Sequence, residues 1–130
     1  MHIQAIYNYF IYLLAGLAMV GVFVTVYTRV TPFCELDLIR KGCVSAALSL
    51  AGATIGFSLT VASSILHNDN FIMFVLWGTL AAVVQVVAYA VLSRALPNMN
   101  AELEDNNVAM GALMGLVSIV VGIINAACLS

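Results

Sequence analysis

Long apolar stretches that contain no charged residue alternate with short polar segments along the chain. The Asp, Glu, Lys and Arg residues leave four stretches uninterrupted: 1–28, 42–68, 70–93 and 106–130. A helix needs about 20 residues to cross the roughly 30 Å hydrocarbon core of a bilayer. Each stretch can therefore cross a membrane once, and none is long enough to cross it twice.

The apolar runs favour helices over barrel strands, because runs such as VQVVAYAVL do not alternate apolar and polar residues. Lipid offers the backbone no hydrogen-bond partners, so the spans must satisfy their own amides. The pattern predicts an all-α, integral membrane four-helix bundle in a single domain, 1–130. The expected spans are about 6–28, 43–66, 71–93 and 107–129, with longer loops at 29–42 and 94–106.

Composition narrows the class of protein further. Hydrophobic residues make up 64% of the chain and charged residues 8%, against about 25% charged residues in soluble domains. So little polar surface cannot cover a water-soluble domain, and four Lys and Arg residues cannot form a basic patch for nucleic acid. We therefore expect a protein that contacts the lipid bilayer and has no nucleic-acid partner.

The positive charges predict the orientation of the spans. All four lie in the two longer loops: Arg29, Arg40, Lys41 and Arg94. Loops rich in Lys and Arg stay in the cytoplasm. We therefore expect both loops in the cytoplasm and both termini outside.

The two halves of the chain resemble each other. Arg29-Val-Thr-Pro32 corresponds to Arg94-Ala-Leu-Pro97, and acidic residues follow both prolines. Each half would form one hairpin, so the two repeats would run parallel. We interpret Pro32 and Pro97 as helix terminators, and Arg29 and Arg94 as residues that reach lipid phosphates at the same boundary. The alternative is that membrane hairpins share a composition without a common origin.

Small residues recur at spacings of three or four, and therefore on one face, in two of the predicted helices. They are Ser45, Ser49, Gly52 and Gly56 in the second helix, and Gly111, Gly115, Ser118 and Gly122 in the fourth. Small residues let helix backbones approach closely in lipid. We expect the two helices to pack along these faces, within one chain or between subunits. The alternative is a pore lined by small and polar side chains.

Few residues inside the predicted spans carry chemistry. The absence of Asp, Glu, Lys and Arg there argues against a proton-coupled pump. The candidate polar residues are Gln85, Asn106, Asn107 and Asn125. Gln85 is expected to bond between helices, and Asn106 or Asn107 to cap a helix. Tyr27 is expected at the inner lipid interface, where aromatic rings gather.

No motif for catalysis or cofactor binding is present. The three cysteines are odd in number and lack C-x-x-C spacing, which indicates neither a disulfide framework nor a zinc site. His2 and His67 are isolated, and the sequence has no phosphate loop. We therefore expect no catalytic, metal or cofactor-binding residue and no enzymatic activity.

A set of residues along the chain resembles a known family. The matching positions are Thr31-Pro32, Glu35, Leu38-Ile39, Leu50-Ala51-Gly52, Gly56, Trp77-Gly78, Gln85, Pro97, Gly111, Gly115, Gly122 and Asn125-Ala126-Ala127-Cys128. Over nearly its whole length the chain is similar to the YjfL-like family of small bacterial inner-membrane proteins, the domain of unknown function 350. Cys43 departs from the pattern, because the family is expected to have an Asn there.

The resemblance implies a bacterial inner membrane, four spans and no established activity. It also implies an envelope-stress or membrane-maintenance setting, because members are often encoded near phage-shock-like and ATP-grasp-like proteins. The leading hypothesis is a non-enzymatic membrane component that forms a homo-oligomer or docks a cytoplasmic or membrane protein. The alternative is a subunit of a small channel or transporter with a polar path through Gln85 and Asn125.

Overall fold

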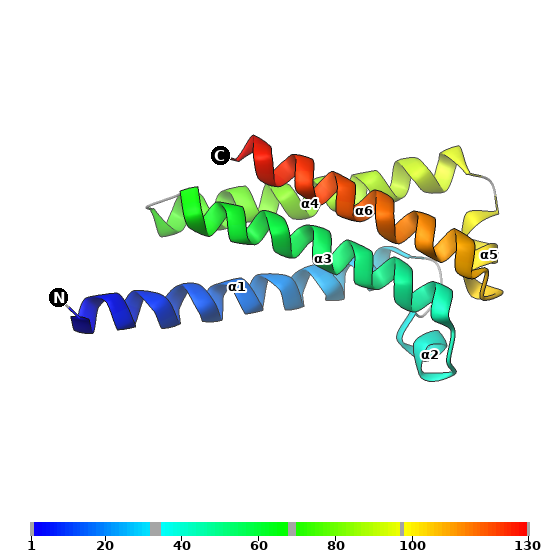
Figure 1. The fold of residues 1–130 in the computed structure, drawn as a ribbon, viewed down its shortest axis with the longest axis horizontal. Coiled ribbons are helices and arrows are strands. Elements are labelled where there is room, and N and C mark those ends of the chain that lie inside the picture. The colour runs from blue at the N-terminus through cyan, green and yellow to red at the C-terminus, as the bar shows by residue number, and fades with distance from the viewer. Residues whose placement is uncertain (1, 32–34, 68–69, 97, 130) are drawn as a thin grey trace.

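The computed structural model describes residues 2–31, 35–67, 70–96 and 98–129, and these residues form six helices (Figure 1). Four are long: α1 (His2–Val30), α3 (Val44–His67), α4 (Phe71–Ala95) and α6 (Val108–Cys128). Two are short: α2 (Glu35–Arg40) and α5 (Met99–Glu104). Each long helix is long and apolar enough to cross a membrane. The prediction of an all-α membrane bundle is therefore confirmed.

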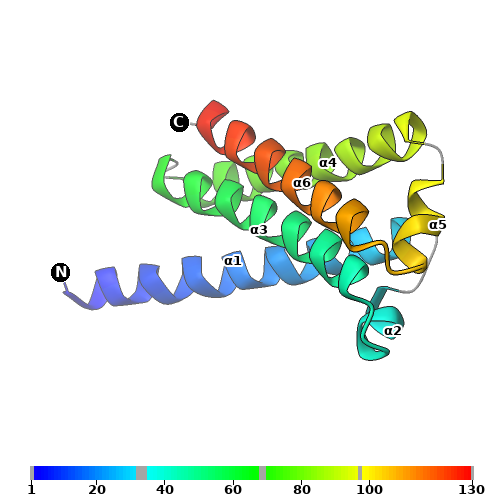
Figure 2. The ribbon, with the colours of Figure 1, turned by 45° about the vertical axis from the view of Figure 1, so that its right-hand side comes forward.

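The long helices run up and down, so that the connections fall at two ends (Figures 1 and 2). Both termini lie at one end, where α3 also ends and α4 begins; we call it the terminal end. The short helices α2 and α5 lie at the other, which we call the short-helix end. Both halves of the chain have the same order of a long, a short and a long helix. A duplication of the hairpin stays a prediction.

Local backbone signals explain where the helices begin. The Asn70 side chain accepts a hydrogen bond from Ile72 N at 2.9 Å and caps α4. Before α3, Gly42 has a φ of 88°, a conformation that side chains with a Cβ rarely adopt. In the second half, Asn106 takes the place of Gly42 two residues before the helix, with a φ of 62°. Asparagine tolerates this conformation better than most residues.

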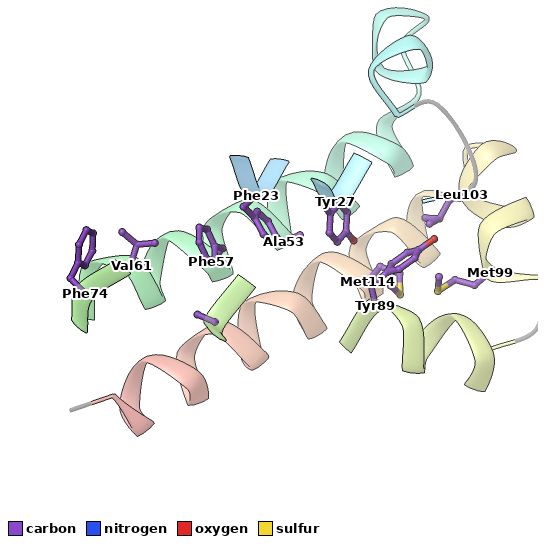
Figure 3. Close-up of a cluster of buried hydrophobic side chains, with 11 residues drawn as sticks. Phe23, Tyr27, Ala53, Phe57, Val61, Phe74, Tyr89, Met99, Leu103 and Met114 are labelled. Carbon is purple, nitrogen blue, oxygen red and sulfur yellow. The ribbon is translucent and has the colours of Figure 1, made fainter. Parts of the chain in front are cut away.

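The core is a row of buried hydrophobic side chains from α1, α3, α4, α5 and α6 (Figure 3). The rings of Phe23 and Phe57 stack with centroids 4.5 Å apart. The Tyr27 and Tyr89 rings meet edge to face at 5.4 Å. These aromatic contacts hold the C-terminal half of α1, toward the short-helix end, against the other helices.

Helix α1 is otherwise loosely held. In its most apolar 18-residue window 11% of the residues are buried, against 50% in α3. Its outer half diverges from the bundle in both views (Figures 1 and 2). A groove of about 470 Å³ with an apolar lining runs between its middle and the middle of α4, with Phe57 at its base. The scaffold of the fold is thus formed by α3, α4 and α6.

Candidate functional site

The two small-residue faces meet each other within the chain, along the contact between α3 and α6. All eight residues named for these faces are buried. A Cβ atom added at Gly52 would overlap the backbone of Gly115, and one at Gly122 would overlap the backbone of Gly56. One at Gly111 would come within 2.5 Å of Ser45 O. The two helix backbones are therefore in direct contact, and this interface has no room for a side chain larger than hydrogen at these positions.

Hydroxyl groups of α3 bond to carbonyl groups across this interface. Ser63 Oγ donates to Ala126 O at 2.6 Å, and Thr60 Oγ1 donates to Gly122 O at 3.2 Å. Ser45 Oγ donates to Leu103 O of α5 at 2.5 Å. Lipid cannot satisfy such groups, so each bond adds to helix association, by about 0.6 kcal/mol on average. These three hydroxyl groups, spread along α3, thus join it to α5 and α6.

Gln85 joins α4 to this helix pair. The residue is 2% exposed, and its Nε2 donates to Ser118 O at 3.3 Å. Its Nε2 also lies beside Gly56, where an added Cβ would approach it to 2.9 Å. Its Oε1 is buried without a hydrogen-bond partner among the described residues. The side chain therefore bridges α4, α3 and α6 and keeps one unsatisfied acceptor.

The two asparagines before α6 have different roles. Asn107 accepts a hydrogen bond from Met110 N at 3.2 Å and caps its own helix. Asn106 Oδ1 accepts from Ser45 N at 3.0 Å and therefore caps α3, which belongs to the other half of the chain. Cys43, which stands where the family pattern has an Asn, directs its Sγ toward Ser45 Oγ at 3.2 Å. The start of α3 thus receives its cap from Asn106.

The remaining candidates lie apart from one another. Asn125 is half-buried near the terminal end, and its Nδ2 has no partner among the described residues. Arg29 and Arg94 are exposed in the last turns of α1 and α4. Pro32 and Pro97 lie outside the described residues, so their role as helix terminators stays a prediction. Gln85 and Asn125 do not meet in any hydrogen bond of the described chain.

A second polar cluster lies at the short-helix end and centres on Glu35. Glu35 begins α2, yet it is 1% exposed. Thr31 forms a hydrogen bond with its carboxyl group, while Oε2 has no partner among the described residues. Burial raises the pKa of this carboxyl from 4.5 to about 7, and the bond with Thr31 offsets part of that rise. A group that titrates near neutral pH is thus enclosed at this end of the bundle.

Two tyrosines complete this cluster. Tyr27 is 1% exposed and interacts electrostatically with Glu35. The Ser49 side chain is near its hydroxyl, but among the described residues the hydroxyl has no hydrogen bond of standard geometry. Tyr89 also interacts with Glu35, and its hydroxyl donates to Asn100 Oδ1. Figure 3 shows both rings near Met99 and Leu103 of α5. The cluster therefore joins side chains from α1, α2, α3, α4 and α5.

This cluster corrects two expectations from the sequence. Tyr27 was expected at the lipid interface, which is wrong because its ring is enclosed between Phe23 and Tyr89. Glu35 was expected in the loop 29–42, whereas the fold of α2 turns it into the bundle. The available signal was the position of Glu35 in the family pattern, four residues after Thr31. Neither its hydropathy nor its spacing indicated burial.

The chemistry available to the cluster is proton exchange and hydrogen bonding. Among the described residues, no group of three or more His, Cys, Asp or Glu side chains lies close enough to hold a metal ion. Cys43 is buried and Cys128 exposed, and both are free thiols. The carboxyl of Glu35 is the group in the cluster whose charge can change near neutral pH.

Fold and contacts together define a small, multi-pass helical membrane protein, with one closely packed helix pair and a buried polar cluster. A family model described as Domain of Unknown Function (DUF350) matches residues 1–129. The chain belongs to this family, as the resemblance in the sequence predicted.

Curated relatives place the family in bacterial membranes. The chain is 29% identical over 119 residues to UPF0719 inner membrane protein YjfL of Escherichia coli (strain K12), covering 92% of this chain and 90% of the relative. It is 26% identical over 110 residues to UPF0719 transmembrane protein YshE of Bacillus subtilis (strain 168), covering 83% and 81%. No solved structure is a significant match. The chain is thus a multi-pass inner-membrane protein.

Proposed function

We propose that the protein is a non-enzymatic membrane component that assembles with further copies of itself through α1. The observation that carries this proposal is an unused small-residue face. Ala18, Gly21 and Thr25 are all exposed on one side of α1, and a Cβ added at Gly21 would meet nothing within 4 Å. Exposed small residues allow another helix to approach closely in lipid.

The rest of the molecule supports this choice of face. The small-residue faces of α3 and α6 already contact each other within the chain, so they are not available to a second copy. Beside the face of α1 lies the apolar groove between α1 and α4, which Ala18, Val22 and Val26 line from the α1 side. A helix from a second copy seated here would contact both α1 and α4. It would also supply the support that α1 lacks within one chain.

Counting the copies in each particle tests this proposal. The full chain would be extracted with its native lipid into nanodiscs, and the copies counted by stepwise photobleaching of a fluorophore. We expect two or more copies per particle for the wild type and one for Gly21→Leu, because a bulky side chain prevents close approach. Ala62→Leu enlarges an equally exposed small residue on α3 and should leave the count unchanged. A wild type that is always monomeric would refute the proposal.

The orientation is part of the same proposal. The short-helix end, which carries the exposed Arg29, Arg40, Lys41 and Arg94, faces the cytoplasm, and both termini face outward. A reporter that is active only in the cytoplasm and fused after residue 130 should be inactive. Activity there would reverse the assignment.

The envelope-stress or membrane-maintenance setting implied by the family resemblance also belongs to this proposal. We extend the proposal to a cytoplasmic or membrane protein that docks on the assembled chains.

A second candidate function is a channel or transporter subunit. It is favoured by the buried polar atoms of Gln85 and Asn125 that have no partner among the described residues. The direct backbone contact of α3 and α6 leaves no path for water at their glycine positions, so a path would have to run elsewhere in the bundle or between chains. The test is ion flux into liposomes that contain the purified protein. Flux with the wild type that is lost in Gln85→Leu would favour this function over assembly alone.

A further inference from the structure

Glu35 holds α2 against the bundle. It is the buried residue of this six-residue helix, and Leu38, which packs partly against the core, is its apolar companion. A helix of this length does not form stably by itself in water. The position of α2 therefore depends on the Glu35 side chain and on the few contacts around it.

The surroundings of Glu35 offer it no positive charge among the described residues. The groups that interact with it are Tyr27 from α1, Tyr89 from α4 and the hydroxyl of Thr31. On its own helix Asp37 and Arg40 are exposed, as are Lys41 after it, Arg29 on α1 and Arg94 on α4, and Glu102 on α5 is half-buried. An ionised carboxylate enclosed without a counterion is strongly disfavoured, and such a group takes up a proton instead.

The hydrogen bonds of Thr31 do not outweigh the burial of the carboxyl. A hydroxyl group has one proton to donate. Thr31 Oγ1 donates to Thr28 O at 3.0 Å. Its bond with the Glu35 carboxyl lowers the pKa of that group, but burial raises the pKa by more.

The described side chains around Glu35 are closely enclosed. Tyr27, Glu35, Met99 and Leu103 are all at most 1% exposed. The groove of about 470 Å³ lies toward the middle of α1 and α4, and Glu35, Tyr89 and Asn100 are not among its lining residues. An alkali or alkaline-earth cation takes about six or more oxygen ligands, whereas Glu35 Oε2 has no partner among the described residues. A proton is the cation that fits.

We propose that the enclosed carboxyl of Glu35 is a proton-binding site, and that loss of this proton to water releases α2 from the bundle. The protonated side chain keeps α2 docked against Tyr27 and Tyr89. The ionised side chain regains its hydration only if α2 moves outward. The site is independent of assembly through α1, because none of these residues belongs to the proposed contact face.

Infrared spectroscopy tests the proton site. The full chain in nanodiscs would be titrated from about pH 5 to about pH 9, a range that contains the expected midpoint. We expect the carbonyl band of a protonated carboxylic acid to persist to near-neutral pH and then disappear. It should be missing in Glu35→Gln and unchanged in Asp37→Asn, which removes an exposed carboxylate from the same helix. The proposal is overturned if the wild type loses this band at the acidic pH usual for exposed carboxyls.

Hydrogen exchange tests the release of α2. After correction for the intrinsic effect of pH, the amides of α2 in the wild type should lose protection by about tenfold or more above the midpoint. The amides of α6 should keep theirs. In Glu35→Gln, which mimics the protonated state, α2 should stay protected throughout. Equal protection of α2 on both sides of the midpoint in the wild type would overturn the docking role, and this measurement needs no variant to fold.

Discussion

Asn106 Oδ1 accepts a hydrogen bond from Ser45 N at 3.0 Å, so the second half of the chain caps a helix of the first half. Asn106 also has a φ of 62°, and glycine preserves that conformation without the cap. Asn106→Gly should therefore cost about 1 kcal/mol, the usual value of a helix cap. Asn106→Ala should cost about 1–2 kcal/mol more, because it adds left-handed backbone strain.

Asn98 provides the control for this pair of variants. Its φ is 69°, and its side chain makes no capping hydrogen bond. Asn98→Gly should therefore leave the free energy of unfolding nearly unchanged in mild detergent. A loss at Asn98 as large as at Asn106 would show that the connection, and not the cap, determines the effect.

Gly52 and Gly21 both lie in the middle of a long helix, but their surroundings differ. Gly52→Ala places a methyl group against the backbone of Gly115, and it should destabilise the bundle by about 1–3 kcal/mol because neither backbone can yield cheaply. Gly21→Ala meets nothing within 4 Å and should be neutral or slightly stabilising, since alanine is the better helix former. Equal effects in a denaturant unfolding series would contradict the α3–α6 contact.

The two tyrosines of the polar cluster differ in whether their hydroxyl group makes a hydrogen bond. Tyr89 donates to Asn100, so Tyr89→Phe should lose about 1 kcal/mol and leave the Asn100 acceptor unsatisfied. Tyr27 has no regular hydrogen bond among the described residues, so Tyr27→Phe should be neutral or stabilising. The comparison of their thermal unfolding reads out the difference. A larger loss at Tyr27 than at Tyr89 would contradict the described bonding.

Burial of Glu35 predicts how stability depends on pH. The pKa of its carboxyl rises from 4.5 to about 7 in the folded protein, so the folded state binds the proton more tightly than the unfolded state. The resulting stabilisation is complete below the unfolded pKa, falls as the pH rises toward 7, and is lost above it. The total is roughly 3 kcal/mol. Unfolding measurements across this range should show the fall in the wild type.

Two variants identify the source of this pH dependence. Glu35→Gln should remove the fall, because it cannot ionise. Asp37→Asn should retain it, because Asp37 is exposed. If the free energy of unfolding of the wild type instead rises between pH 4.5 and about pH 7, a buried, protonated Glu35 is contradicted.

The sequence predicts the four long apolar helices well and the polar cluster poorly, for a physical reason. Span positions follow from the charge-free stretches, because hydrocarbon excludes charge whatever the tertiary contacts are. The burial of Glu35 depends on α2 folding back against the bundle, where it contacts α3. That is a tertiary effect, and local composition does not encode it.

The positions of the small residues show the same limit. Their spacing predicts that α3 and α6 pack along these faces, but it does not say whether they meet within one chain or between subunits. It also gives no sign that Gly21 remains exposed while Gly52 and Gly115 are enclosed. Likewise Asn106 was expected to cap a helix, and only the fold shows that the helix is α3.

Assembly through α1 is the central claim, and cross-linking in native membranes tests it most directly. Gly21→Cys and, as a control, Ala62→Cys would each be introduced into a chain whose own three cysteines are replaced by serine. Mild oxidation should produce a disulfide-linked dimer for Gly21→Cys and a monomer for Ala62→Cys. A monomer for Gly21→Cys, or a dimer that forms equally at position 62, would contradict the claim.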